Sequence, residues 1–226
     1  MCGRFVAATT PGQLGQFFDA GLPDVDLAER YNVAPTAHVY TIISDADVRR
    51  SIEAMRWGLL PHWATSQAGK PLFNARAETL ATNRSFARSF QQRRCLIPAD
   101  GFYEWTTDGN DGSKQPHYIM HRDGDPLAFA GIWRTWHEPK TDNTLDTCTI
   151  ITCPPNQTME SIHDRMPVIL APTSWGQWLN PTTRIVNLTK LLGPAPNELL
   201  TTHLVSTDVN SARNDRPQLV QPIKKP

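Results

Sequence analysis

The chain has 226 residues, of which 39% are hydrophobic and 19% charged, as expected for a globular protein long enough to bury a core. Its 22 basic and 22 acidic side chains exclude a strongly basic protein, so any contact with a polyanion depends on a local patch. No apolar run approaches the roughly 20 residues of a membrane span, and the start of the chain lacks the pattern of a secretory signal. We expect a cytoplasmic protein.

Taken in chain order, the predicted elements begin with a helix that Thr10 caps and Pro11 opens, burying Leu14, Phe17 and Phe18. A strand over 39–43 follows, and then a helix capped by Thr82 or Asn83 that carries Phe86 and Phe90. Five more strands are expected over 94–98, 101–105, 117–120, 127–133 and 147–152, with a hairpin loop at 106–115. Short helices are predicted over 156–162, 173–179 and 196–203.

This order of elements predicts an α+β fold with a mainly antiparallel, barrel-like β-sheet core and several short peripheral helices. One domain over residues 1–226 is the economical interpretation, with a tail from about residue 214 loosely held. Trp133, Trp175 and Trp178 are expected in the core. The four cysteines are expected to be reduced, and the spacing of Cys148 and Cys153 does not favour zinc.

Cys2 carries the most distinctive chemistry of the chain. Its small side chain permits removal of Met1, after which Cys2 holds a free α-amine and a thiol on adjacent carbons. An α-amine with a pKa of about 7.7–8.0 is partly neutral at cellular pH. It can condense with an aldehyde to an imine, and the thiol then closes a thiazolidine ring. A buried structural cysteine is the alternative interpretation.

Six sequence blocks occur in a fixed order along the chain. They are Met-Cys-Gly-Arg-Phe at 1–5, Arg-Tyr-Asn-Val-Ala-Pro-Thr at 30–36, Arg-Trp-Gly-Leu-Leu-Pro at 56–61, Phe-Asn-Ala-Arg-Ala-Glu-Thr at 73–79, Pro-Ala-Asp-Gly-Phe-Tyr-Glu-Trp at 98–105, and Ile-His-Asp-Arg-Met-Pro at 162–167. Together they resemble the signature blocks of the SOS-response-associated peptidase family, from Cys2 to Asn210.

The resemblance implies a protein that binds abasic sites in single-stranded DNA and crosslinks to them through the N-terminal cysteine, shielding the lesion in the DNA damage response. We expect a monomer, nucleoid-associated in a bacterium, and the proposed mechanism requires no metal or organic cofactor. The family name adds a peptidase activity, here self-removal of Met1, although an aminopeptidase could equally remove it. A weak AP-lyase activity through the imine is compatible with the same chemistry.

The resemblance assigns a role to four residues. Cys2 matches the crosslinking cysteine, and Asn74 matches the asparagine that orients the reacting groups. Glu104 matches the catalytic glutamate, and His163 matches the histidine that helps to open the sugar ring. The chemistry asks for these residue types, because ring opening and imine formation both need proton transfer near neutral pH.

A DNA surface is expected around residues 70–94, where Lys70, Arg76, Arg84, Arg88, Arg93 and Arg94 face a single acid, Glu78. The resemblance makes Arg76 and Arg84 phosphate-binding residues, and Arg4 lies beside the nucleophile. It also places Pro35 and Thr152 in the groove. Trp63 is a candidate for base stacking, although some relatives carry two tryptophans where this chain has Trp63-Ala64. Arg88 and Arg93 fit a solvated helix face better.

Two other function classes remain open from the residues. One is an N-terminal-nucleophile cysteine amidohydrolase, because glutamine amidotransferases also begin Met-Cys-Gly. The other is a non-enzymatic DNA-binding module in which Cys2 is structural. Release of ammonia from glutamine supports the first, and DNA binding without a covalent product supports the second.

Overall fold

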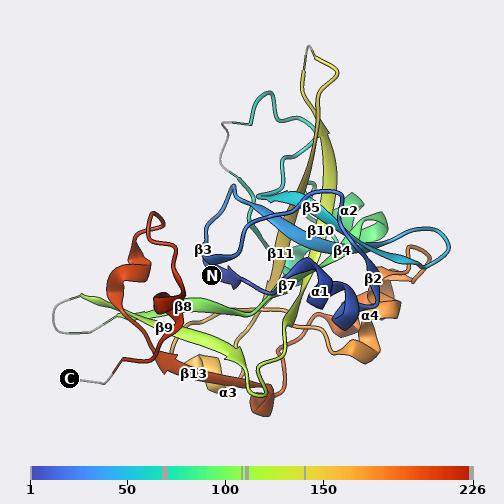
Figure 1. The fold of residues 1–226 in the computed structure, drawn as a ribbon. Helices are drawn as coiled ribbons and strands as arrows, with labels where there is room; N and C mark the ends of the chain where they lie inside the picture. Colours follow the sequence, from blue (N-terminus) through green and yellow to red (C-terminus); the bar gives the residue numbers. More distant parts are fainter. Residues whose placement is uncertain (1, 68–70, 108, 110–111, 140, 224–226) are drawn as a thin grey trace.

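The computed structural model of the chain describes residues 2–67, 71–107, 109, 112–139 and 141–223 (Figure 1). One sheet has the strand order β13-β9-β8-β1-β3, and the other has the order β12-β11-β10-β7-β4-β5-β2. The first sheet consists of β1 (Phe5–Ala7), β3 (Arg30–Val33), β8 (Gly101–Thr107), β9 (Lys114–His121) and β13 (Leu200–Leu204). The second consists of β2 (Ala20–Gly21), β4 (His38–Ser44), β5 (Arg50–Trp57), β7 (Arg94–Ala99), β10 (Leu127–His137), β11 (Thr144–Cys153) and β12 (Met166–Pro167), with β6 (Asn74–Arg76) paired to β11.

The second sheet closes on itself through a parallel pairing of β11 with β5. In that pairing Thr147 lies opposite Arg56, and Cys148 lies opposite Trp57. Strands β5, β4, β7, β10 and β11 therefore form a five-stranded barrel whose other neighbouring pairs are antiparallel. This confirms the expected α+β fold with a mainly antiparallel, barrel-like core.

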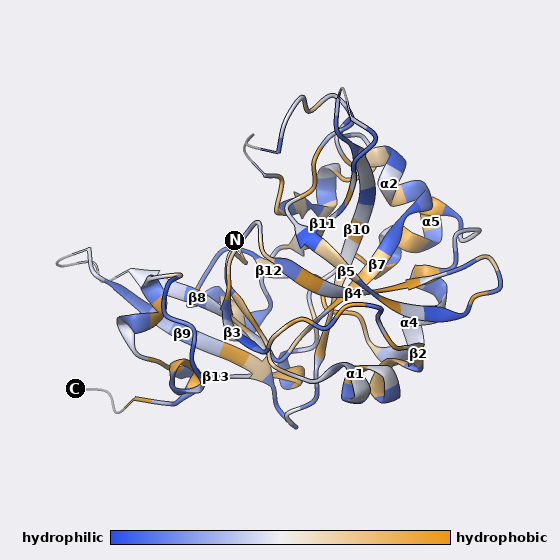
Figure 2. Ribbon diagram, turned by 45° about the horizontal axis from the view of Figure 1, so that its top comes forward, coloured by the Kyte–Doolittle hydropathy of each residue, from blue (hydrophilic) through white to orange (hydrophobic). Residues whose placement is uncertain are grey.

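Aromatic side chains join the barrel to the first sheet. The ring of Phe5 in β1 lies 5.0 Å from that of Trp57 and 6.1 Å from that of Phe129, measured between ring centroids. Phe102 in β8 also contacts Phe129, at 5.9 Å. Figure 2 shows hydrophobic residues where β4, β5 and β7 cross, and hydrophilic residues toward the outer ends of β8 and β9. The two sheets thus share one apolar core.

The six predicted strands are confirmed as β4, β7, β8, β9, β10 and β11, each longer than its sequence pattern. Strands β8 and β9 form the expected hairpin, with Thr107 opposite Lys114. Residues 108, 110 and 111 of the predicted loop lie outside the described residues. The eight-residue barrel strand β5 was not predicted, and neither were shorter strands such as β3 and β6; long-range pairing defines them.

Two helix predictions are confirmed closely. Helix α1 (Pro11–Phe18) begins with a capping box between Thr10 and Gln13, and α4 (Pro172–Leu179) starts one residue before its expected bound. Phe17 is only partly buried, which corrects its expected place in the core. The predicted helix at 156–162 shortens to α3 (Gln157–Glu160), which Asn156 caps by accepting from Met159 N. An unpredicted short helix, α5, covers Ile185–Leu188.

Two helix predictions are corrected by the structure. The segment expected to be helical over 196–203 forms a 3₁₀ turn at Asn197–Leu199 and then β13, which pairs with β9. Thr201 and Thr202 are β-branched, and the segment pairs through its backbone with the free edge of β9. This tertiary pairing outweighs local helix propensity. The helix expected from Thr82 or Asn83 begins only at Ala87, as α2 (Ala87–Gln92), although Phe86 and Phe90 are buried as expected.

The expected loose tail is not seen for residues 214–223. Asp215 pairs with Arg30 and accepts from the backbone N of Tyr31 at 2.6 Å. A 3₁₀ turn, Pro217–Val220, then buries Leu219 in a small apolar cluster with Tyr103. Specific contacts with β3 and β8 therefore hold this segment against the first sheet.

Of the three tryptophans expected in the core, Trp175 and Trp178 are buried, and Trp133 is partly buried against the core. No helix within the described part of the chain is long and apolar enough to cross a membrane.

Candidate active site

Strand β1 brings the N-terminal segment alongside β8. Phe5 pairs with Phe102, and the backbone N of Tyr103 donates to the carbonyl of Arg4 at 3.0 Å. Continued toward residue 2, this antiparallel register places Gly3 opposite Glu104, so Cys2 lies one residue from that position. Cys2 is fully buried, and burial, followed by the nearby Glu104 carboxylate, raises the pKa of its thiol well above the ordinary value.

Asn74 reaches Cys2 from the barrel side. Strand β6 pairs in parallel with β11, with Asn74 opposite Ile150, and the carbonyl of Phe73 accepts from Trp57 Nε1 at 2.9 Å. Held in this way, Asn74 Nδ2 donates to the Cys2 carbonyl at 2.9 Å. Its Oδ1 is buried and has no hydrogen-bond partner among the described residues. This arrangement leaves an acceptor beside the segment that carries the nucleophile.

Glu104 supplies a buried carboxyl group at the junction of the two sheets. It lies in β8 opposite His117 of β9, and its side chain is 3% exposed. Burial raises the pKa of Glu104 from its ordinary value of 4.5 to about 7. A carboxyl group poised near neutral pH can both accept and release a proton at cellular pH.

His163 faces Glu104 from the loop after α3. Its Nε2 lies 3.8 Å from Glu104 Oε2, and its backbone N donates to the carbonyl of Met159 at 2.9 Å. The Arg165 backbone N donates to Nδ1 at 2.9 Å, so the neutral ring carries its proton on Nε2, toward Glu104. Asp164 Oδ1 also lies 2.9 Å from Nδ1, but the side chain of this carboxylate is 87% exposed. Burial lowers the pKa of His163, which favours the neutral ring.

Arg165 is a positioning residue that the sequence did not single out. Its guanidinium pairs with Glu78 and donates to the Thr152 carbonyl at 2.6 Å. These contacts tie the loop that carries His163 to β11 and to the turn after β6. The block at 162–167 contains Arg165, but no local pattern distinguishes a loop-anchoring arginine from a DNA-binding one.

The residues expected to contact DNA fall into two groups. Trp63 is 49% exposed, with the guanidinium of Arg84 5.9 Å from the centre of its ring, and Ser85 completes a shallow hollow. Arg76 is exposed and lies two residues after Asn74 in β6, so both side chains point to the same face of the strand. These three residues are accessible to a ligand.

Three other residues of that prediction are less accessible. Arg4 Nη1 donates to Asn32 Oδ1 and to the Val209 carbonyl, both at 2.8 Å, which fits an anchor between β1 and the C-terminal segment. Thr152 is fully buried, which conflicts with a place in the lining of an open groove. Pro35 is partly buried in the turn between β3 and β4.

The basic segment 70–94 does not act as one surface. Arg94 is 3% exposed and donates to four backbone carbonyls, including those of Trp178 and Asn180 at 2.6 Å. It therefore holds α2 and α4 against the barrel. Lys70 lies outside the described residues. Within the described part of the chain, no cluster of histidine, cysteine or acidic residues has the arrangement of a metal site.

Residues 1–212 match the protein family described as SOS response associated peptidase. The chain belongs to this family. The abasic site processing protein YoqW of Bacillus subtilis is 41% identical over 225 residues, which cover 98% of this chain and 99% of YoqW. The abasic site processing protein YedK of Escherichia coli is 32% identical over 230 residues, or 99% of this chain and 100% of YedK.

Relatives and solved structures extend this similarity. The abasic site processing protein HMCES of Xenopus tropicalis is 34% identical over 227 residues, covering 85% of this chain and 66% of HMCES. A crystal structure of a Bacteroides thetaiotaomicron protein superimposes with a TM-score of 0.87 at 27% identity, over 99% of this chain and 100% of that one. A Bordetella bronchiseptica protein shares the fold, with a TM-score of 0.77 at 24% identity over 91% of this chain and 100% of that one.

Membership of the SOS response associated peptidase family confirms the resemblance inferred from the six blocks. Four of the blocks contain Cys2, Asn74, Glu104 and His163. Asn74 lies on β6 and Glu104 on β8, while Cys2 lies just before β1 and His163 just after α3. These segments are distant in sequence and meet at the junction of the two sheets.

Proposed function

We propose that this protein processes abasic sites in single-stranded DNA by forming a thiazolidine between Cys2 and the ring-opened deoxyribose, once Met1 has been removed. The observation that carries the proposal is the meeting of four groups. Asn74 binds the Cys2 carbonyl, while the Glu104 carboxyl group lies between Cys2 and His163. The names of the relatives YoqW, YedK and HMCES support the same lesion as the substrate.

The reaction begins with opening of the sugar. An abasic deoxyribose is mostly a closed hemiacetal, and exposure of its aldehyde moves a proton from the C1′ hydroxyl group to the ring oxygen. His163, neutral and only partly exposed, is the residue that we assign to this transfer.

Glu104 then accepts and donates protons at the Cys2 amine during formation of the imine. The neutral amine attacks C1′, and loss of water from the resulting carbinolamine leaves an imine. The Cys2 sulfur adds to the imine carbon, and the thiol proton moves to the nitrogen, so the net products are the thiazolidine and one water. Because burial holds the pKa of the thiol high, sulfur keeps its proton until this step. Asn74 fixes the Cys2 backbone while the ring forms.

The exposed residues beside the site suit a single strand. Trp63 offers an aromatic face to a base, and Arg84 and Arg76 offer guanidinium groups to phosphates. Hydrolysis of the Met1–Cys2 bond by the chain itself, and weak strand cleavage through the imine, are further reactions that the same groups support.

The test is a denaturing gel of protein whose loss of Met1 has been confirmed by mass spectrometry, incubated with a single-stranded oligonucleotide that carries one abasic site. We expect a heat-stable shifted band from the wild type and none from Cys2→Ala. Cys148→Ala, which removes another buried thiol, is the matched control and should crosslink like the wild type. Absence of a band from processed wild-type protein would contradict the proposal, and release of ammonia from glutamine would then favour the amidohydrolase.

If Glu104 and His163 act in proton transfer, their substitution should slow crosslinking but still yield the thiazolidine product. Glu104→Gln and His163→Ala should each lower the rate by about 10²–10⁴-fold, the usual range for general acid–base catalysis. The measurement is the initial rate of crosslinking with DNA at saturation, where weaker binding does not contribute. Glu160→Gln, an exposed glutamate in α3, is the control for Glu104. A wild-type rate for Glu104→Gln would remove Glu104 from the mechanism.

A further inference from the structure

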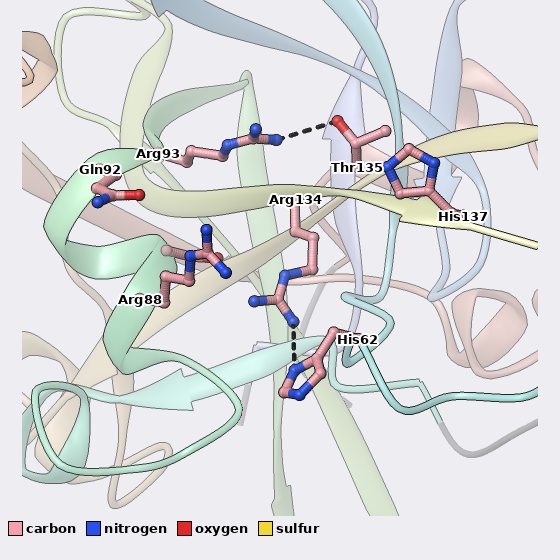
Figure 3. Close-up of a pocket in the computed structure, with 8 residues that line it drawn as sticks. His62, Arg88, Gln92, Arg93, Arg134, Thr135 and His137 are labelled. Atoms are coloured by element: carbon pink, nitrogen blue, oxygen red, sulfur yellow. Dashed lines mark hydrogen bonds between the residues drawn. The ribbon is translucent and has the colours of Figure 1, made fainter.

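A basic hollow lies outside the Cys2 site, between α2 and β10. It has a volume of about 410 Å³, and three arginines and two histidines contribute to its lining, without a carboxylate among the described residues that line it. Figure 3 shows Arg88 on α2 facing Arg134 on β10, with Arg93 at the end of α2 beside them. The hollow is therefore positively charged, although the chain as a whole is neutral.

Arg134 is the buried member of this set. It is 9% exposed, and its Nη1 lies 3.3 Å from His62 Nδ1. A guanidinium only donates, so His62 accepts this bond as a neutral ring. Burial, followed by the charges of Arg88 and Arg93, lowers the pKa of Arg134. Arg134 forms no ion pair with any described acidic residue. Its positive charge is thus repelled by two neighbours and balanced by none of these acids.

The other contacts hold the arginines in place without neutralising them. Arg93 Nη1 donates to Thr135 Oγ1 at 3.1 Å, and its guanidinium lies 4.8 Å from the centre of the Trp133 ring. Arg88 is exposed on α2. The nearby acid by strand register is Asp146, opposite Thr135, and it forms no ion pair with a described basic residue. The remaining donors of three guanidinium groups suit an oxyanion with several acceptor oxygens.

His62 in the lining of the hollow lies next to the exposed aromatic side chain of Trp63. His62, which accepts from Arg134, precedes Trp63 in the chain, and the two rings lie 4.8 Å apart, edge to face. The Arg84 guanidinium lies over the Trp63 ring, 5.9 Å from its centre. Trp63 thus has the Arg84 guanidinium over its ring and, through His62, the Arg134 guanidinium nearby, so a strand stacked on Trp63 would meet phosphate-binding groups from both residues.

We propose that Arg88, Arg93 and Arg134 form a phosphate-binding subsite for the nucleic-acid backbone, beyond the base that stacks on Trp63. The inference deepens the proposed function and rests on its DNA-binding part, but not on the covalent chemistry of Cys2. It extends the DNA surface from Arg84 to α2 and β10, and it includes Arg88 and Arg93, which sequence patterning assigns to a solvated helix face. Free inorganic phosphates share the same chemistry as ligands.

The test measures binding of a fluorescent single-stranded oligonucleotide without an abasic site, so that no crosslink forms, at several salt concentrations. The variants are Arg134→Gln and the surface pair Arg88→Gln with Arg93→Gln, which preserves the test if the buried change disturbs folding. Arg122→Gln, an exposed arginine in the turn after β9, is the control. The slope of log Kd against log salt concentration should fall by about 0.7 for each phosphate that a variant no longer binds, and Arg122→Gln should keep the wild-type slope.

Two results would overturn the inference. One is a wild-type slope and affinity in both folded pocket variants. The other is calorimetric binding of pyrophosphate that Arg134→Gln abolishes while the DNA slope stays unchanged, which would assign the hollow to a free phosphate compound. Because the oligonucleotide has no lesion, failure of the crosslinking proposal leaves this test intact.

Discussion

Glu104 shows how a single residue combines a structural penalty with chemistry. A carboxyl group that is 3% exposed beside Cys2 and His163 is disfavoured in its charged form, which raises its pKa to about 7. A surface glutamate would stay ionised at neutral pH and would be a weaker proton acceptor. Burial of this carboxyl group should therefore make the free energy of unfolding depend on pH, which can be measured apart from catalysis.

The free energy of unfolding should fall as the pH rises, because of Glu104. Glu104 keeps its proton in the folded state up to pH of about 7, whereas its ordinary pKa is 4.5. Between these values the folded chain binds more protons than the unfolded chain, so the free energy of unfolding falls as pH rises. Relative to the wild type, Glu104→Gln should gain roughly 2 kcal/mol between pH 5 and pH 8.

Urea unfolding at both pH values measures this effect on protein that retains Met1. The exposed Glu160→Gln should follow the wild type at each pH. An equal difference between Glu104→Gln and wild type at pH 5 and pH 8 would mean that the pKa of Glu104 is not raised in the folded protein.

At the scale of elements, the C-terminal segment is the clearest departure from the sequence pattern. Pro222, Pro226 and several polar residues suggest a loose tail from about residue 214, yet Asp215 bonds to β3 and Leu219 is 1% exposed. The residues just before it supply the Val209 and Asn210 carbonyls that accept from Arg4, next to the N-terminal strand, and Asn32 of β3 donates to the Asn214 carbonyl. It thus supports β1, which carries Cys2 into the site.

Truncation of Leu219 should destabilise the protein in proportion to this burial. Leu219→Ala should lower the free energy of unfolding by about 2–5 kcal/mol, because it leaves a cavity in the cluster with Tyr103 and Val205. Leu22→Ala, the same change at a side chain that is 67% exposed, should stay within about 0.5 kcal/mol of wild type. Denaturant unfolding compares the two variants. A free energy of unfolding for Leu219→Ala equal to that of the wild type would indicate a loose tail.

At the scale of the whole molecule, closure of the barrel depends on one glycine. Gly58 has a φ of +129°, and its N donates to the Cys148 carbonyl at 2.8 Å, next to the parallel seam between β5 and β11. A Cβ atom at this position would lie 2.6 Å from Pro71 Cβ. Only glycine fits both the backbone conformation and the space.

Gly58→Ala should therefore lower the free energy of unfolding by at least about 2 kcal/mol. Gly176→Ala in α4, where a Cβ meets no atom within 4 Å, should instead stabilise the protein by up to about 1 kcal/mol. We also propose that the chain is a single domain, because the two sheets share one core. Both variants should then unfold in one cooperative transition, and two separate transitions would contradict a single domain.

The sequence by itself determined the fold class, six of the strands, the family and the identity of the four site candidates. It did so because alternating β-branched and aromatic residues predict strands from local pattern, and because six ordered blocks are specific. Local pattern could not predict β13, since the edge of β9 decides whether 200–204 is extended. Nor could it separate the buried Arg94 from the exposed Arg84.

Only the tertiary structure decided the environment of each candidate. The raised pKa of Glu104, the bond from Asn74 to Cys2 and the anchoring of His163 by Arg165 depend on segments that are distant in the chain. So does the gathering of Arg88, Arg93 and Arg134 around one hollow. Burial and charge depend on neighbours in space, and the sequence records only neighbours along the chain.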